Sequence, residues 1–254
     1  MTLELQTTPS EMAKPRTNLL RKCRGILVVM VVVIVGVFVY LAIFPTPQAR
    51  ALQRIHELGG YAGGIDDRPI DPFKLAGLPW PTFLPRLPLM KGDVTMFVVE
   101  GKAVTDRDVE IFCEAFPLTV EAWLVSTPVS SEGLQPLATL PRLCRLRLYH
   151  TQADDRFLAS LSSPYLQVLE LVGAQVTDEG VGRFVSSRSG ISQLNLSSTV
   201  VTDQTCVELA KLKEIYLVDL TFTRVTADGV TLLQTAHPHC KIIWDEPLPV
   251  NNSE

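Results

Sequence analysis

The sequence predicts an α/β solenoid, in which short parallel strands alternate with helices, preceded by one transmembrane helix. The first observation is a repeat: segments such as LELVGAQVTD from Leu169 and LNLSSTVVTD from Leu194 recur six times within residues 97–229. Equivalent anchor residues are spaced 25, 24, 23, 25 and 24 positions apart: Lys102, Thr127, Thr151, Ala174, Thr199 and Thr223. A fixed period in the twenties is typical of solenoids, in which each unit buries its apolar face against its neighbours.

The second observation is an apolar run. Residues 25–44 read GILVVMVVVIVGVFVYLAIF, twenty residues without a charge. As a helix this run would span roughly 30 Å, which matches the hydrocarbon thickness of a bilayer. The sequence therefore predicts that residues 25–44 contact the lipid bilayer as a transmembrane helix.

The charges that flank this run predict its orientation. Residues 1–24 carry a net charge of +3, and four of their cations lie within nine residues of the run. The positive-inside rule then places residues 1–24 in the cytoplasm and the remainder of the chain outside it. We therefore expect a single-pass protein with an uncleaved signal anchor and an extracytoplasmic C-terminal domain.

A cleaved secretory signal is the alternative. The small-x-small sequence Ala49-Arg50-Ala51 suits signal peptidase. However, the apolar run is longer than the roughly 7–15 residues of a secretory signal. Cleavage would release a soluble form of the same domain.

Net charge and cysteine usage restrict the partners. The residues after Phe44 include 18 Lys and Arg and 25 Asp and Glu, a net charge of −7. This disfavours nucleic acid, which needs clustered cations. The five cysteines, Cys23, Cys113, Cys144, Cys206 and Cys240, are scattered without a C-x-x-C motif, so we expect single thiols packed in the repeats.

These patterns divide the chain into five parts. We predict a cytoplasmic tail (1–24), a transmembrane helix (25–44), a helix with a proline-rich connector and N-terminal cap (45–93), a repeat domain (94–244) and a C-terminal tail (245–254). Within the third part, residues 49–58 are expected to form a helix with Leu52, Ile55 and Leu58 on one face, ended by Gly59-Gly60. Trp80 and Phe83 are expected to cover the first repeat, because terminal repeats need capping.

Each repeat has the same internal order. Two alternating apolar residues predict a short strand with both side chains inward, in the pairs Phe97/Val99, Ala122/Leu124, Leu146/Leu148, Leu169/Leu171, Leu194/Leu196 and Val218/Leu220. Hydroxyl residues that suit a helix N-cap follow: Thr105, Ser130, Thr177, Thr202 and Thr226. Acids that favour the positive end of a helix come next: Asp106, Asp178 and Asp203. Cys240–Trp244 is predicted to be a closing strand.

The pattern L-x-L-x-x-T-x-V-T-D-x-G resembles the leucine-rich repeat, in its helix-bearing class of 23–25 residues. It is related to cysteine-containing repeats, with threonine here at the usual cysteine position. It is also similar to membrane-anchored bacterial proteins with this Thr-type repeat. The resemblance implies strands on a concave side, helices on a convex side and a binding role. Residues 1–92 contain nothing like the adaptor box of ubiquitin ligases, so no such role is implied.

Side chains that flank the inward strand positions face the concave side of such a solenoid. Four of them fall together on adjacent repeats: Trp123, Arg145, Arg147 and Tyr149. Trp, Tyr and Arg are enriched at binding hot spots, so we predict a protein-binding patch here. Glu121, Glu170 and His150 are further candidate residues of this patch, after the first four. A glycan is the second candidate ligand, after a protein. In the alternative interpretation this face is merely solvated, and its arginines pair with Glu121 and Glu170.

No motif in the sequence indicates catalysis or a cofactor. A nucleophile elbow, a Walker loop, an H-E-x-x-H sequence and a dinucleotide-binding glycine pattern are all missing from the sequence. His237-Pro-His239-Cys240 lacks the second ligand pair of a structural zinc site. We therefore expect a binding module with no cofactor and no enzymatic activity. The alternatives are a structural or envelope-organising protein without a specific ligand and, third, a hydrolase using His150.

Overall fold

The computed structural model of the protein describes residues 30–31, 35–36, 46–63, 94–187 and 190–246. Its contacts divide the chain into two units, Met1–Thr46 and Pro47–Glu254. In the first unit residues 30–31 and 35–36 are helical. The second unit contains the repeats.

Several predictions from sequence fall outside the described residues. These are the cytoplasmic tail, most of the transmembrane run 25–44, the proline-rich connector with Trp80 and Phe83, Cys23, and the end of the C-terminal tail. Among the residues that the structure does describe, no helix combines the length and apolar character needed to cross a membrane.

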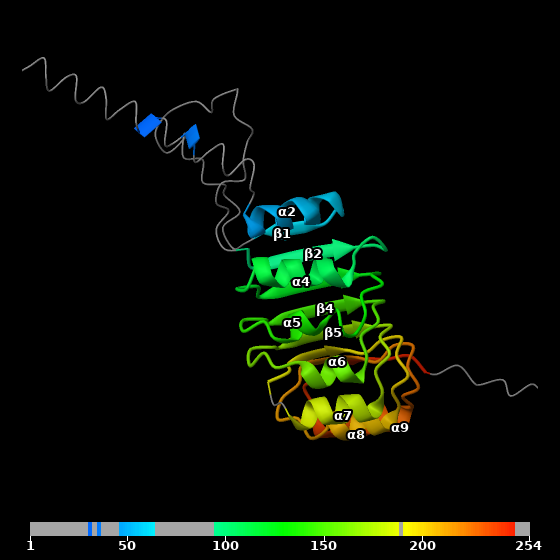
Figure 1. The fold of residues 1–254 in the computed structure, drawn as a ribbon. Coiled ribbons are helices and arrows are strands. Elements are labelled where there is room, and N and C mark those ends of the chain that lie inside the picture. The colour runs from blue at the N-terminus through cyan, green and yellow to red at the C-terminus, as the bar shows by residue number, and fades with distance from the viewer. Residues whose placement is uncertain (1–29, 32–34, 37–45, 64–93, 188–189, 247–254) are drawn as a thin grey trace, which may run out of the picture. The chain divides into compact units, whose positions relative to one another are not determined.

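The second unit is built on one sheet of eight strands arranged in chain order (Figure 1). The strands are β1 (Tyr61–Gly63), β2 (Met96–Glu100), β3 (Glu121–Val125), β4 (Arg145–Tyr149), β5 (Val168–Val172), β6 (Gln193–Asn195), β7 (Leu217–Asp219) and β8 (Lys241–Ile243). β1 pairs antiparallel to β2, and every later neighbour is parallel. The predicted inward pairs are all buried, and β8 confirms the predicted closing strand.

Helices alternate with the strands and lie on one side of the sheet (Figure 1). They are α2 (Pro47–Glu57), α4 (Asp106–Ala115), α5 (Gln135–Ala138), α6 (Asp155–Ser160), α7 (Asp178–Ser186), α8 (Asp203–Leu209) and α9 (Ala227–Ala236). The side chains between sheet and helices form one continuous apolar core. This arrangement leaves the opposite face of the sheet for the alternate, outward side chains.

The predicted N-caps are confirmed at three helices. Thr105, Thr177 and Thr202 each accept a hydrogen bond from a backbone N–H of the first turn. Asp154 caps α6 in the same way, accepting from the N–H groups of Arg156 and Phe157.

One predicted N-cap, Ser130, is wrong, and another, Thr226, holds the cap position without the capping bond. α5 begins only after Leu134, and the Ser130 hydroxyl instead accepts from Gly133 N–H at 3.0 Å in a preceding turn. The reason is Pro136, which has no N–H and fits only the first turn of a helix. Thr226 is the N-cap residue of α9, as predicted, but its side chain makes no capping hydrogen bond.

The acids after the caps connect successive repeats, which the sequence alone did not indicate. The Asp203 carboxylate accepts from both the backbone N–H and the hydroxyl of Thr226, each at 2.7 Å. The same pair of bonds joins Asp106 to Ser130, Asp155 to Thr177 and Asp178 to Thr202. At four of the five steps between repeats, an aspartate therefore holds a hydroxyl residue that precedes the helix of the next repeat, and we call this set of bonds the aspartate ladder.

The ladder also explains two helical glycines. A Cβ on Gly180 would lie 2.0 Å from Asp155 Oδ1, and one on Gly229 would lie 2.3 Å from Asp203 Oδ1. A side chain at either position would displace the carboxylate. The T-D-x-G pattern therefore needs glycine at its last position because the aspartate of the preceding repeat occupies the space that a side chain would fill.

The two ends of the repeat stack are closed differently. At the N-terminal end α2 buries Ala51 and Ile55, with Leu52 and Leu58 partly buried against the core, which confirms the predicted apolar face. Arg54 Nε donates to Asp108 Oδ1 of α4 at 2.7 Å.

At the C-terminal end Trp244 packs against the core. Its Nε1 donates to the carbonyl oxygen of Val225 at 2.8 Å. These contacts cover the apolar surface that the last repeat would otherwise expose to solvent.

Candidate concave binding site

The strand register brings the predicted patch residues onto three neighbouring strands. Trp123 of β3 is the Cα partner of Arg147 in β4, and Arg147 is in turn the partner of Glu170 in β5. Glu121 pairs in register with Arg145. Neighbouring strands lie about 4.8 Å apart, so these side chains are within direct reach of one another.

Arg147 is the centre of this cluster. Its Nε donates to Glu170 Oε1 at 2.8 Å, and its Nη1 donates to Glu121 Oε1. The guanidinium carbon lies 4.4 Å from the centre of the Trp123 ring, a cation–π arrangement. Only 19% of the Arg147 side chain is exposed. Burial acts to lower the pKa of Arg147, but the two carboxylates outweigh it and raise that pKa overall.

The two glutamates fix the aromatic rings as well. Trp123 Nε1 donates to Glu121 Oε1 at 2.6 Å, and the Tyr149 hydroxyl donates to Glu170 Oε2. Burial, and then the adjacent Glu170 carboxylate, raises the pKa of Tyr149 to about 12, so the hydroxyl stays protonated as a donor. Five predicted residues therefore form one hydrogen-bonded unit, which we call the concave cluster: Glu121, Trp123, Arg147, Tyr149 and Glu170.

Arg145 lies beside this cluster, but it makes fewer and longer contacts than Arg147 does. Its side chain is 54% exposed, and its ion pair is a 3.5 Å contact between Nη1 and Glu121 Oε2. The carboxylate that it faces is already bonded to Trp123 and Arg147. Arg145 is thus the exposed cation of the patch.

His150 lies at the turn that follows β4. Its φ of 52° is left-handed, as at the equivalent positions of the other repeats: Gly101, Ser126, Gly173, Ser198 and Phe222. The imidazole covers Gly173, since a Cβ there would lie 2.5 Å from His150 Nδ1. The structure therefore places His150 at the edge of the sheet, next to the following turn rather than among the bonds of the concave cluster.

Sequence reasoning missed one residue of this face. Tyr61 of β1 is the Cα partner of Val98, so it extends the row of Val98, Trp123 and Arg147 toward the N-terminal end. It is 44% exposed. The strand β1 has only three residues and directly follows Gly59-Gly60, so its sequence shows too little alternation of apolar and polar residues to predict a strand.

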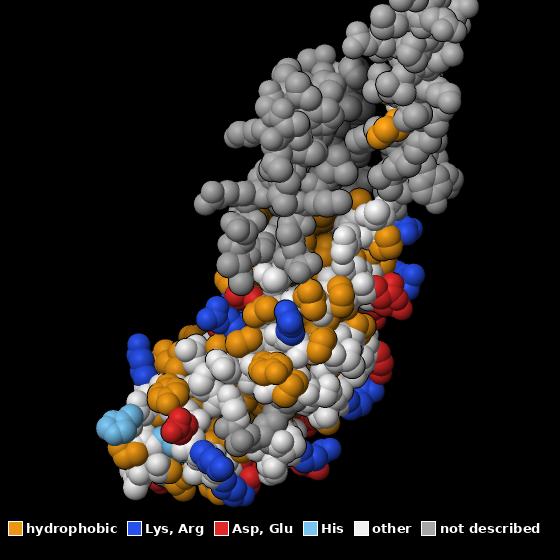
Figure 2. Space-filling model, turned by 90° about the vertical axis from the view of Figure 1, so that its left-hand side faces the viewer, with side chains coloured by type: hydrophobic (Ala, Val, Ile, Leu, Met, Phe, Trp, Pro, Cys, Tyr) orange, Lys and Arg blue, Asp and Glu red, His pale blue; other side chains and the backbone are white. Residues whose placement is uncertain are grey.

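The edge at which the strands begin is apolar. Figure 2 shows the left-hand side of Figure 1, from which the strands start, and hydrophobic side chains gather over the middle of that face. The loops that lead into β5 and β7 carry two exposed tyrosines, Tyr165 (63% exposed) and Tyr216 (55%). Arg145 is the first residue of β4 and therefore lies at this edge.

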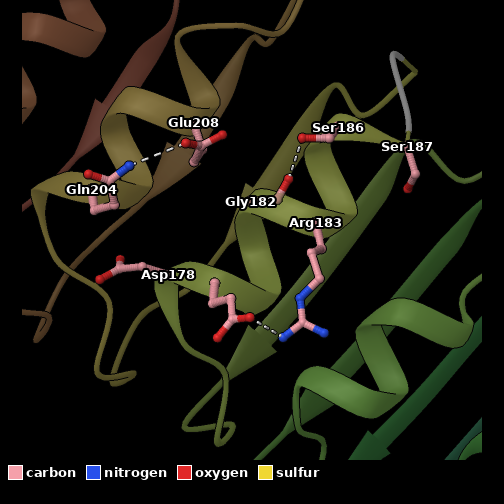
Figure 3. A pocket seen from close by; sticks show the side chains of 8 residues that line it. Asp178, Gly182, Arg183, Ser186, Ser187, Gln204 and Glu208 are labelled. Carbon is pink, nitrogen blue, oxygen red and sulfur yellow. Dashed lines mark hydrogen bonds and ion pairs between the residues drawn. The ribbon is translucent and has the colours of Figure 1, made fainter.

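The helical side offers a groove between α7 and α8, shown in Figure 3. Its polar groups bond one another: Arg183 pairs with Glu179 at 2.9 Å, and Gln204 donates to Glu208 at 3.2 Å. Gly182 gives room to Glu208, whose Cγ lies 3.1 Å from where a Cβ would be. Because these partners satisfy one another, the groove shows no group directed at a ligand.

The histidines near the C-terminal end do not suggest a metal site. His237 Nε2 lies 3.1 Å from the carbonyl oxygen of Leu209. Within the described part of the chain, no group of three His, Cys, Asp or Glu side chains is placed to hold a metal ion.

The architecture defines a class: parallel strands and helices repeating every 23–25 residues form a leucine-rich-repeat-like solenoid. No family model matches the sequence, and no curated protein matches it. Among solved structures, internalin C2 from Listeria monocytogenes is similar over 63% of this chain and 76% of its own, with 16% identity and a TM-score of 0.40.

Two receptor kinases are also similar. Pollen Receptor Kinase 3 aligns over 81% of this chain and 99% of its own, with 12% identity and a TM-score of 0.42. The Arabidopsis receptor kinase HAESA, solved with the peptide hormone IDA and the co-receptor SERK1, aligns over 78% of this chain and 33% of its own, with 14% identity and a TM-score of 0.40. These likenesses concern the fold alone.

Proposed function

We propose that this protein is a membrane-anchored, extracytoplasmic binding module that recognises a protein partner through the concave face of its repeats. The observation that carries the proposal is the concave cluster with Arg145 beside it. Tryptophan, tyrosine and arginine converge there from adjacent strands, and these residues dominate protein–protein hot spots. This composition favours a protein over a glycan.

The bonds within the cluster support binding because they fix the side chains in advance. Trp123 is held at its Nε1 by Glu121 and covered on one face by Arg147. A side chain that is already ordered loses less conformational entropy when a partner binds. The cluster is therefore suited to act as a rigid anchor.

The membrane anchor and its orientation belong to the same proposal. They rest on the uncharged run 25–44 and on the net charge of +3 in residues 1–24. In intact cells, and in a background with Cys23 and Cys144 replaced by serine, a cysteine introduced at an exposed position of the repeat domain should react with a membrane-impermeant maleimide. A cysteine introduced at Ser10 in the same background should not react. The reverse labelling pattern would contradict this orientation.

One observation favours the structural or envelope-organising alternative. Arg147, Glu121 and Glu170 satisfy one another within the chain, as expected for a network that only stabilises the sheet. A binding module and a structural protein can be distinguished with a variant that changes the exposed side chains of this face but keeps these three residues. Only a binding module should lose its partner in such a variant.

Affinity capture from native membranes distinguishes them. The full chain in detergent serves as bait, beside a Trp123→Leu/Arg145→Gln variant and an Arg224→Gln control. Arg224 is exposed on a turn, away from the concave face. Binding through this face predicts a protein that the wild type and the control retain and the double variant loses. Identical capture by all three baits would support the structural alternative.

A further inference from the structure

The two arginines of β4 face the same side of the sheet but have different surroundings. Arg147 is 19% exposed and bonds two carboxylates and an aromatic ring. Arg145 is 54% exposed and makes one 3.5 Å contact with an oxygen of Glu121. A guanidinium has five N–H donors, so most of those on Arg145 point to solvent.

From this asymmetry we infer that Arg145 is the specificity-determining contact of the concave site and binds an acidic side chain, Asp or Glu, of the protein partner. The inference rests on the proposed function and names the chemistry of its ligand. Arg147 has the separate role of a positioning residue, which holds Trp123 through its stacked guanidinium.

The placement of the charges supports this assignment. Arg147 bonds both Glu121 and Glu170 at hydrogen-bonding distance, and these three buried or half-buried groups together carry a net charge of −1. Arg145 brings the net charge of the four side chains to zero, but its guanidinium is the most exposed of these charges and meets Glu121 only at 3.5 Å. An incoming carboxylate can form a two-pronged pair with the exposed guanidinium fork without displacing any bond of the cluster.

The surroundings of Arg145 supply contact area for the rest of such a segment. Val168 of β5 is its Cα partner, and the exposed Tyr165 lies three residues before Val168 in the loop that leads into β5. On the other side the cluster presents Trp123. An acidic residue flanked by apolar residues therefore fits this surface.

The test uses peptides as probes. A phage library of random 12-residue peptides is selected on the full chain reconstituted in nanodiscs, and the binders are synthesised. We expect the binders to share an Asp or Glu next to an apolar residue. Arg145→Gln should weaken them about ten-fold or more, because a charge-assisted pair is lost. Arg224→Gln should leave binding within about two-fold, since rim charges away from a contact matter little.

A charge swap completes the test. Arg145→Glu should recover binding to peptides in which the acid is replaced by Lys, and it should not recover binding to the original peptides. If Trp123→Leu abolishes binding while Arg145→Gln leaves it unchanged, the assignment to Arg145 is wrong and the concave site stands. If neither variant affects any selected peptide, or no peptide is selected, the proposed function fails together with the inference.

Discussion

The guanidinium carbon of Arg147 lies 4.4 Å from the centre of the Trp123 ring, one strand away. The same guanidinium donates to Glu121 and Glu170, each of which also accepts from an aromatic side chain. One arginine therefore bonds two carboxylates, each of which holds an aromatic ring. We therefore propose that stability at this face depends on Arg147 and that binding depends on Arg145.

Replacing Arg147 by Gln should destabilise the fold by about 1–3 kcal/mol, because two half-buried carboxylates lose their shared cation. The loss is smaller than for a fully buried pair because water still reaches these groups. Urea denaturation followed by circular dichroism measures it. Arg145→Gln is the matched control and should cost less than about 0.5 kcal/mol, as expected for an exposed pair. Equal losses for both variants would refute the division of roles.

Adding a methyl group at Gly180 should break one bond pair of the aspartate ladder. The new Cβ would lie 2.0 Å from Asp155 Oδ1, so the carboxylate must leave Thr177. We expect Gly180→Ala to lower stability by about 1–3 kcal/mol, although alanine is the better helix former.

Gly190→Ala is the control for this prediction, since no atom lies within 4 Å of a Cβ there. Its effect on the melting temperature should be close to zero. A Gly180→Ala protein as stable as the wild type would mean that the ladder contributes nothing at this step.

Protonation of Asp178, one aspartate of the ladder, should lower the stability of the fold in acid. Burial acts to raise the pKa of Asp178, but hydrogen bonds from the backbone and hydroxyl of Thr202 and from Thr205 outweigh it and lower that pKa. A carboxyl with a lowered folded-state pKa contributes stability that is complete above its unfolded pKa of about 3.9 and is lost as the pH falls below it.

Asp178→Asn should therefore lower stability at pH 7 and flatten its dependence on pH below about 4. Thermal melts of both proteins between pH 2.5 and 7 measure this slope. Parallel curves for the two proteins would exclude Asp178 as a source of the acid sensitivity.

The described cysteines should differ in reactivity. Burial raises the pKa of Cys113 and of Cys206 to about 12, with nearby aspartates adding to the effect at Cys206. Both thiols should stay protonated and resist iodoacetamide at pH 8 in the folded protein. Cys144 is only half-buried and should react first. Peptide mapping by mass spectrometry after timed alkylation measures the order in which the cysteines react. Rapid labelling of Cys206 would contradict its burial.

The sequence predicts strands and caps well where the signal is local. The Leu169/Leu171 alternation and the Thr177 cap each depend on a few adjacent residues, and both are confirmed. The predicted cap at Ser130 is wrong because its repeat departs from the pattern, and because Pro136 in the first turn makes the helix α5 begin later. The aspartate ladder could not be seen in one repeat, since its partners lie 22–24 residues apart.

The candidate site was predictable only in part. Equal spacing of the repeats is enough to align Trp123, Arg147 and Glu170 in one row, and the register confirms it. Which arginine each glutamate would bond depends on rotamers and burial, which spacing does not determine. The unequal exposure of Arg145 and Arg147 therefore emerged only from the structure.

Photo-cross-linking in native membranes is the decisive test of whether the concave face binds a protein. Benzoylphenylalanine replaces Gln193, which is exposed on β6 beside Val168, or Val207, which is exposed on the helix α8. If the concave face binds a protein, a discrete cross-linked partner should form from position 193, be absent from position 207 and be lost with Arg145→Gln. The same adducts from both positions, or from position 207 alone, would contradict it.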